Sequence, residues 1–211
     1  MTHPRIFLLS PANCGGNRAR IVMSERAAFD LAVQLRTRTG APLGDVFAFL
    51  SGLYFRGKLT YSRAFARPPE AASLCGSGIF VITPTAGLRL ADTPITLNAL
   101  RAFAAVDIDA DNPRYRRPLE TSARAVAADI GPDCDVVLLG SIASRKYVDV
   151  LQAIFGDRLV FPADFVGRGD MSRGGLMLRS AAAREELPYI PVAGAVRNGK
   201  RPPKLPPLKT A

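Results

Sequence analysis

The chain has 211 residues, 48% of them hydrophobic, and a formal net charge of +10. This length fits one large domain or two small ones, and the hydrophobic content argues against a disordered chain. The charge favours an anionic partner such as a nucleotide or a nucleic acid, although an inert basic surface would give the same number. No apolar run reaches the length of a membrane span, and residues 6–9 are too short for a signal sequence, so we predict a cytoplasmic protein without a membrane partner.

Histidine and cysteine usage narrows the possible chemistry. His3 is the single histidine and lies near the start, so the chain cannot build a serine–histidine triad or a histidine-rich metal centre. Cys14, Cys75 and Cys134 are odd in number, widely spaced and without a CxxC motif, which excludes a disulfide scaffold and disfavours zinc. We therefore predict no metal and no cofactor.

The first predicted strand, residues 5–9, ends in a polar, glycine-containing loop over residues 10–17. Such a loop is a common ligand site in open α/β sheets, which makes Ser10 and Asn13 candidate binding residues. The loop has neither a GxGxxG fingerprint nor a Walker lysine, and a plain connection is the alternative interpretation.

Helical patterns follow. Ser24 is a predicted N-cap for a helix that Gly40 closes, and a second apolar run covers residues 45–53 and resumes over residues 59–66. Residues 54–58 interrupt that run.

The interruption mixes aromatic and basic residues. Tyr54, Arg56 and Lys58 could hold a base by stacking and a phosphate by charge. The alternative places the aromatic rings in the core and the basic groups on a solvated face.

The second predicted strand, residues 79–82, is followed by hydroxyls and glycine, so Thr83 and Gly87 are further candidates. A short helix is predicted up to Phe103. Residues 106–117 are predicted to be a solvated loop, because their acidic residues lack the spacing of a calcium loop.

An amphipathic helix over residues 119–130 leads to a third strand, residues 135–139, which ends at Gly140 and the candidate Ser141. A helix over residues 145–155 then leads to a fourth strand at residues 158–161.

Residues 161–175 combine four glycines with two arginines, two aspartates and a serine. We predict a loop here that precedes a helix over residues 176–186 and binds an anion through backbone N–H groups and arginine forks. Arg168, Ser172 and Arg173 are its candidate binding residues. Acid–base catalysis would then use carboxylates or nearby groups, with helix capping and ion pairing as the alternative for the aspartates. These candidates are Asp164, Asp170, Lys146 and Tyr147.

Apolar strands that alternate with helices predict an α/β fold, with a mostly parallel, Rossmann-like sheet flanked by helices. Residues 1–196 form the predicted single domain, and residues 189–192 a small edge strand. Residues 197–211 form a basic, proline-rich tail, predicted to be extended and solubilising, with binding to a phosphate backbone or a neighbouring subunit as the alternative. The candidate loops should gather at the carboxyl edge of the sheet.

Short stretches of the chain resemble the YaaA-like proteins, known for peroxide stress and duplex DNA binding, and related domains associated with deazaguanine modification. The similar pieces are Ile6–Ala12, Leu53–Tyr54, Ile79–Leu88 and Val136–Ser141. Asn13 stands where YaaA-like proteins have lysine. The resemblance implies involvement with DNA or nucleobases.

Two classes of function follow from these features. The first is an enzyme acting on a nucleotide, nucleoside or base; the second is a non-enzymatic nucleic-acid-binding stress protein. A structural partner subunit, alone or in an oligomer, is a third option.

Overall fold

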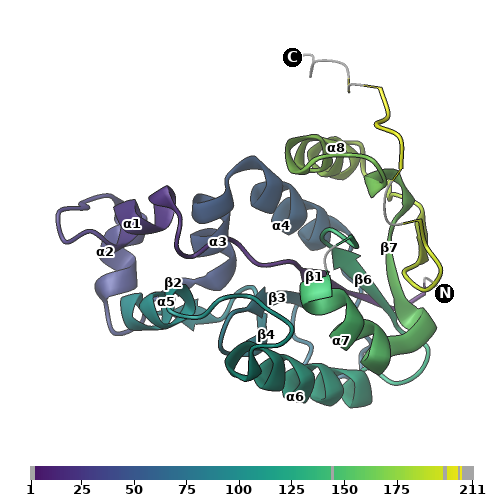
Figure 1. The fold of residues 1–211 in the computed structure, drawn as a ribbon, viewed down its shortest axis with the longest axis horizontal. Coiled ribbons are helices and arrows are strands. Elements are labelled where there is room, and N and C mark those ends of the chain that lie inside the picture. The colour runs from purple at the N-terminus through teal and green to yellow at the C-terminus, as the bar shows by residue number, and fades with distance from the viewer. Residues whose placement is uncertain (1–2, 144, 197–198, 204, 206–211) are drawn as a thin grey trace.

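The computed structural model describes residues 3–143, 145–196, 199–203 and 205. A six-stranded sheet with the order β4-β3-β1-β6-β7-β8 forms its centre (Figure 1). The four middle strands are parallel, and the two edge strands, β4 and β8, run antiparallel to their neighbours. The strands are β1 (Arg5–Leu9), β3 (Ile79–Thr83), β4 (Gly87–Leu90), β6 (Asp135–Leu139), β7 (Leu159–Pro162) and β8 (Tyr189–Pro191).

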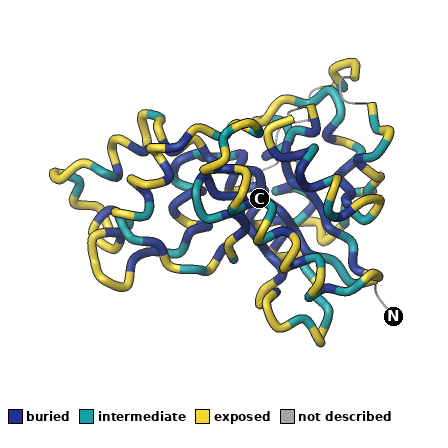
Figure 2. The backbone as a smooth tube through the Cα atoms, turned by 60° about the horizontal axis from the view of Figure 1, so that its bottom comes forward, coloured by how far each residue is buried: buried dark blue, intermediate teal, exposed yellow. Residues whose placement is uncertain are grey.

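The middle strands are almost entirely apolar because both faces of the sheet are covered; the charged residues Arg5 and Asp135 lie at the first positions of β1 and β6. In the register of the sheet, Phe7 of β1 pairs with Ile79 of β3 and with Val137 of β6. All five residues of β3 are buried, as are the last four of β1 and of β6. Figure 2 shows this buried backbone running through the middle of the molecule, with exposed segments around it.

Helices cover the two faces of the sheet. Figure 1 shows α4 and α8 on one side, and α6 and α7 on the other. A smaller region with α1, α2, α3, α5 and a two-stranded antiparallel pair, β2 and β5, extends from one end. The helices are α1 (Asn17–Met23), α2 (Asp30–Arg36), α3 (Leu43–Ser51), α4 (Leu53–Phe65), α5 (Leu97–Ala104), α6 (Pro113–Asp129), α7 (Arg145–Phe155) and α8 (Asp170–Ala183); the short elements are β2 (Ala41–Pro42), β5 (Pro94–Ile95), η1 (Gly156–Arg158) and η2 (Ala163–Phe165).

Two glycines bring α4 and α8 into backbone contact. A Cβ added to Gly57 would lie 2.6 Å from the carbonyl oxygen of Gly174, and one added to Gly174 would lie 2.9 Å from Cα of Tyr54. Side chains at these positions would therefore push the helices apart. The close approach places the first turns of both helices next to each other.

The strand order produces a crevice between β1 and β6. The chain leaves β1 through α1–α4 to reach β3 on one side, and leaves β6 through α7 to reach β7 on the other. Figure 1 shows α4 and α7 on opposite faces of the sheet. Neighbouring parallel strands whose connections diverge in this way open a crevice at their carboxyl ends, where α/β proteins bind ligands.

Several predicted boundaries are wrong. The break between the two central helices falls at Gly52, whose φ of +64° suits glycine, so residues 54–58 lie inside α4. Helix α8 begins at Asp170, β7 extends to Pro162 and η2 covers Ala163–Phe165, so only residues 166–169 of the predicted glycine-rich loop are irregular. Ser24 ends α1 instead of starting a helix, and α6 begins at Pro113, where Asn112 caps it. The edge strand predicted for residues 189–192 is confirmed as β8.

The tail is described only in part. Residues 197–198, 204 and 206–211 lie outside the described residues. Of the rest, Gly199 and Lys200 lie against Val166 and Gly167, and Leu205 lies near Gly175. The described residues of the predicted tail therefore pack on the chain's own segment around α8.

Candidate functional site

The carboxyl ends of β1 and β6 meet at Ser10 and Gly140. The backbone N–H of Ser10 donates to the carbonyl of Leu139 (3.1 Å) and continues the pairing of the two strands. A Cβ on Gly140 would lie 2.8 Å from Cβ of Ser10 and 2.8 Å from the hydroxyl of Tyr147. Glycine at position 140 therefore leaves the room in which Ser10 and Tyr147 approach each other.

Lys58 reaches Ser10 from α4. Its Nζ donates to the Ser10 hydroxyl at 2.7 Å and to the Ser10 carbonyl at 3.0 Å. The ammonium group also lies 4.0 Å from the ring centroid of Tyr54 and 5.2 Å from that of Phe55. Lys58 is only 1% exposed, which is rare for lysine because burial removes the hydration of its charge.

Burial lowers the pKa of Lys58 to about 7. Two charged residues at the start of α8 act on the same group: Asp170 raises the pKa and Arg173 lowers it. The α4–α8 contact at Gly57 and Gly174 places these charges near Lys58. Near neutral pH a substantial fraction of the protein molecules therefore carry Lys58 as an uncharged amine, which can accept a proton.

Tyr147 of α7 completes the polar group around Ser10. Its hydroxyl accepts from the N–H of Ser141 and donates to the carbonyl of Ser141, both at 3.0 Å. Burial raises the pKa of Tyr147, and hydrogen bonding from Ser10 opposes that increase. The phenol is therefore neutral and holds the β6–α7 turn in place beside Ser10.

A buried hydroxyl without a well-formed hydrogen bond belongs to Tyr54, whose ring lies against Lys58. Tyr54 is 7% exposed, and its hydroxyl makes no hydrogen bond of normal geometry to a described residue, although the Arg173 guanidinium is close enough to lower its pKa. Burial raises the pKa of this phenol, against the effect of the neighbouring Arg173. An unpaired buried hydroxyl is destabilising, so the site holds a polar group in an unfavourable environment.

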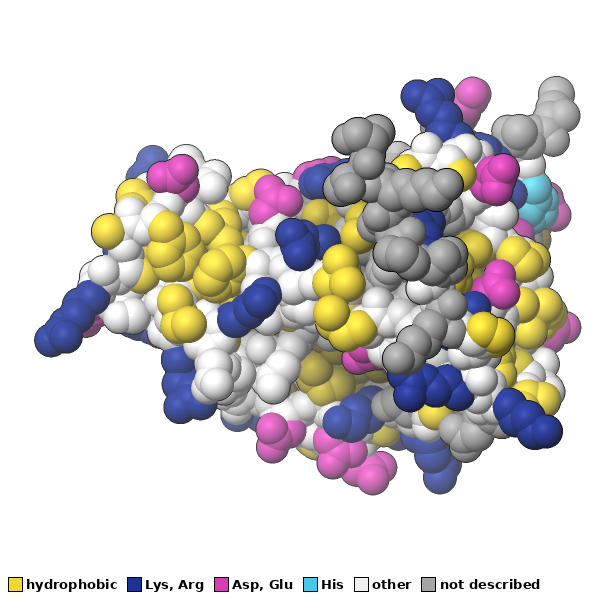
Figure 3. All heavy atoms as spheres, turned by 90° about the horizontal axis from the view of Figure 1, so that it is seen from above, with side chains coloured by type: hydrophobic (Ala, Val, Ile, Leu, Met, Phe, Trp, Pro, Cys, Tyr) yellow, Lys and Arg dark blue, Asp and Glu magenta, His cyan; other side chains and the backbone are white. Residues whose placement is uncertain are grey.

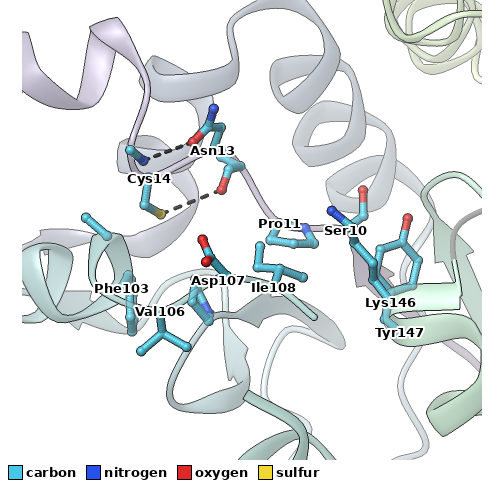
Figure 4. A pocket seen from close by; sticks show the side chains of 14 residues that line it. Ser10, Pro11, Asn13, Cys14, Phe103, Val106, Asp107, Ile108, Lys146 and Tyr147 are labelled. Carbon is cyan, nitrogen blue, oxygen red and sulfur yellow. Dashed lines mark hydrogen bonds between the residues drawn. The ribbon is translucent and has the colours of Figure 1, made fainter. Parts of the chain in front are cut away.

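A cavity of about 470 Å³ opens in front of Ser10, and we call it the Ser10 cavity. Figure 4 shows Ser10, Lys146 and Tyr147 at one end and Cys14, Phe103 and Val106 at the other. Its size is within the range of small-molecule sites. Its lining consists of Ser10, Pro11, Ala12, Asn13, Cys14, Gly15, Pro84, Phe103, Ala104, Val106, Asp107, Ile108, Lys146 and Tyr147.

Of the predicted site residues, some line or support the Ser10 cavity and others lie elsewhere. Ser10, Asn13 and Lys146 line it. Lys58 and Ser141 support it from behind, through Ser10 and Tyr147.

Thr83 and Gly87 instead build the turn between β3 and β4. The fully buried Thr83 hydroxyl donates to the carbonyl of Gly87 and accepts from the N–H of Ala86, while Gly87 has a φ of +65° and packs against Pro118. These contacts account for both residues without a ligand.

Arg168 and Ser172 lie in another hollow, of about 340 Å³, which we call the Arg168 hollow. Arg168 donates to the carbonyls of Asp164 and Pro203 and to the Ser172 hydroxyl. Asp164 is exposed on η2. The hollow is lined by Arg168, Gly169, Met171, Ser172, Gly175, Arg179, Arg201, Pro202, Pro203 and Leu205.

Arg173 and Asp170 lie between these two regions. The Arg173 guanidinium donates to the carbonyl of Phe165 and pairs with Asp170 at 3.7 Å. Arg173 is thus engaged with its own chain and affects the Lys58 site through its charge. Arg56 is separate from both, in a third hollow with Arg18 and Arg63.

Some cavity residues had no signal in the sequence. Phe103, Asp107 and Ile108 belong to the end of α5 and to a stretch predicted to be a solvated loop. Their place in the wall depends on how α5 packs against the loop after β1. Tyr147 was predicted only as an alternative acid–base group, because nothing in the sequence places it beside Ser10.

Cys14 also lines the cavity, but its thiol is a poor nucleophile. It donates to the carbonyl of Ala12, and burial raises its pKa to about 12. Since the thiolate is the reactive form, Ser10 with its amine neighbour is the better candidate nucleophile in this cavity.

Comparison of the chain with protein-family models, with curated proteins and with solved structures finds no match. In the described part of the chain, no helix is both long and apolar enough to cross a bilayer. The described residues also contain no cluster of three or more histidine, cysteine or acidic side chains placed to hold a metal ion.

Proposed function

We propose that this protein is an enzyme that binds a nucleotide or nucleoside in the Ser10 cavity and acts on it there. The observation that carries the proposal is the buried Lys58–Ser10 pair at the crevice between β1 and β6. A lysine whose pKa lies near neutrality, hydrogen-bonded to a serine that lines a cavity, is an arrangement typical of active sites.

The lining of the cavity supports a ligand that has both a ring and polar groups. Phe103, Val106 and Ile108 offer an apolar wall for a base, and Asn13 and Asp107 offer hydrogen-bonding groups to its edge. Lys146 supplies a positive charge at the Ser10 end, where a phosphate or other anion would be held. The net charge of +10 favours such ligands further.

The proposal also covers the fold family, the single-domain organisation, the cellular location and the family resemblance. The parallel order β3-β1-β6-β7, with the crevice beside β1, supports a Rossmann-like fold in a single domain. We propose a cytoplasmic location, and we retain the resemblance to YaaA-like proteins as a proposal of nucleobase-related chemistry. Asn13, which replaces the lysine of those proteins, lines the Ser10 cavity.

A thermal-shift and calorimetric screen of nucleotides, nucleosides and bases tests the proposal. We expect at least one compound to stabilise the wild type and to bind Lys146→Ala more weakly, about tenfold or more for a lost charged contact. Arg145→Ala is the matched control, because Arg145 is the preceding residue of α7, pairs with Asp149 and does not line the cavity. Equal loss in both variants, or no ligand at all, contradicts the proposal.

Nucleic-acid binding without catalysis is the second candidate, and the charge balance favours it. Figure 3, however, shows Lys and Arg side chains spread over the viewed face without gathering into one patch. An electrophoretic titration with duplex DNA at two salt concentrations tests this candidate, since phosphate contacts make affinity fall steeply with salt. The absence of a shift at low salt rejects it.

A further inference from the structure

We propose that Ser10 is a nucleophile for acyl transfer and that Lys58 is its general base, so that the chain cleaves a carboxylic ester through an acyl-serine intermediate. The inference rests on the proposed ligand site in the Ser10 cavity but not on the nucleotide character of its ligand. Its substrate class is an ester whose acyl group fits the polar end of that cavity.

The geometry places the two groups in the required relation. Ser10 lines the cavity, and its hydroxyl lies 2.7 Å from Nζ of Lys58, which does not line the cavity. Lys58 is 1% exposed, so its amine is shielded from water and from direct acylation, whereas Ser10 adjoins the space that a substrate would occupy. Tyr147 and Gly140 fix the position of Ser10 from the β6 side.

The protonation of Lys58 fits the role of a base. The groups that face it are Ser10 from the loop after β1, Tyr54 and Phe55 from α4, and the charges of Asp170 and Arg173 from α8. Burial dominates and leaves the amine largely neutral above about pH 7. A neutral amine can accept the Ser10 proton, whereas an ammonium group cannot.

The reaction balances with groups on the chain and a water molecule. Lys58 takes the Ser10 proton as Oγ bonds to the carbonyl carbon, and the carbonyl electron pair moves to its oxygen. When the oxyanion collapses, the C–O bond to the leaving alcohol breaks, and the alcohol takes the proton from Lys58. Water then attacks the acyl-serine by the same sequence, releasing the acid and restoring Ser10.

Backbone donors for the oxyanion are available in the loop after β1. Ala12, Asn13 and Cys14 line the cavity, and their N–H groups donate to no described backbone carbonyl, which leaves them free to serve as oxyanion donors. Acyl transfer needs no more than these groups, namely a nucleophile, a base and donors to a single oxyanion.

The experiment is covalent labelling of the full chain with p-nitrophenyl acetate and, separately, with a fluorophosphonate, followed by mass spectrometry of the peptides. We expect p-nitrophenol release with acetylation at Ser10, and a rate that rises with pH through about 7 and then levels off. Ser10→Ala should lose the modification. Lys58→Met should react at least about 100-fold more slowly than the wild type. Ser77→Ala, which replaces an exposed serine outside the cavity, should react like the wild type.

Several results would overturn the inference: no labelling of Ser10, labelling by the fluorophosphonate alone, a rate independent of pH, or wild-type reactivity in a folded Lys58→Met. If a variant does not fold, labelling of the wild type at Ser10 and the pH dependence of its rate still test whether Ser10 is a base-activated nucleophile. The probes contain no nucleotide. A probe can therefore label Ser10 even if no nucleotide binds, and a nucleotide can bind even if no probe labels Ser10. The failures of the two proposals are therefore distinguishable.

Discussion

The Ser10 cavity and the Arg168 hollow differ in what they demand of the folded chain. Behind the first, Lys58 is buried at 1% exposure, and Tyr54 keeps a hydroxyl without a described partner. In the second, Arg168 is partly exposed and bonded to backbone carbonyls and to Ser172. Arg168 is thus an ordinary surface arginine, whereas Lys58 is a destabilising residue that packing alone does not require.

The contrast separates an unusual stretch of sequence from a buried polar group as signs of a reactive site. The glycine- and arginine-rich stretch over residues 161–175 is the most unusual segment of the sequence, yet Gly174 serves helix packing and Arg168 contacts the described tail. The short loop at Ser10 is unremarkable in sequence, yet β1, β6, α4 and α7 all contribute to its surroundings. Burial of a charged or polar group indicates function better than composition does.

Of the tests that separate the Ser10 cavity from the Arg168 hollow, the largest effect is expected for Lys58, which should make the free energy of unfolding depend on pH. Its pKa is lowered from 10.5 to about 7 on folding, so between these values the unfolded chain binds more protons. The stability of the wild type relative to Lys58→Met should therefore rise with pH, by up to about 1.4 kcal/mol per pH unit in this window. Urea unfolding of both proteins from pH 6 to pH 10 measures it, and a constant difference contradicts the buried-lysine interpretation.

Adjacent glycines in α8 provide the next test. Gly174→Ala should destabilise the protein by about 1–3 kcal/mol, because the new methyl group would meet the backbone of Leu53 and Tyr54 at 2.9 Å. Gly175→Ala is the control: its nearest neighbour would be the Leu205 side chain at 3.8 Å, so the better helix propensity should stabilise by up to about 1 kcal/mol. Chemical denaturation of the two variants decides, and equal effects would refute the α4–α8 contact.

Two separate Tyr→Phe substitutions test whether the Tyr54 hydroxyl is unpaired. Tyr54→Phe should be neutral or stabilise by about 1 kcal/mol, because it removes a buried hydroxyl that has no hydrogen bond of normal geometry and only the Arg173 guanidinium nearby. Tyr61→Phe should instead destabilise by about 1–2 kcal/mol, because the Tyr61 hydroxyl bonds to that of Tyr189 (2.6 Å) and accepts from the N–H of Leu187 (2.9 Å). Thermal melts of both variants distinguish the cases; a clear loss in Tyr54→Phe would mean that its hydroxyl has a partner.

The smallest effect is expected in the Arg168 hollow. Arg168→Ala should change the free energy of unfolding by less than about 0.5 kcal/mol, since its partners are neutral oxygens near solvent. It should also leave the labelling of Ser10 unchanged. A large fall in Ser10 reactivity would show that the two regions work together, as the sequence analysis predicted.

The sequence determined the core of this fold. The predicted strands at residues 5–9, 79–82 and 135–139 are confirmed, and the one predicted at 158–161 forms one residue later, as Leu159–Pro162, because short apolar runs suit a sheet covered on both faces. The helix over residues 145–155 is confirmed as well. Of the loops expected to gather at the carboxyl edge of the sheet, those of Ser10, Asn13 and Ser141 come together, since β1 and β6 are parallel neighbours, whereas Arg168 and Ser172 lie in another hollow.

Tertiary structure decided the rest. The break at Gly52, the start of α8 at Asp170 and the place of α5 in the cavity wall depend on contacts between segments far apart in the chain. The pairing of Lys58 with Ser10 joins residues 48 positions apart, through the glycine contact of α4 with α8 and the order of β1 and β6. A sequence pattern records which residues are apolar or charged, but only packing determines which charge loses its water, and that loss gives Lys58 its chemistry.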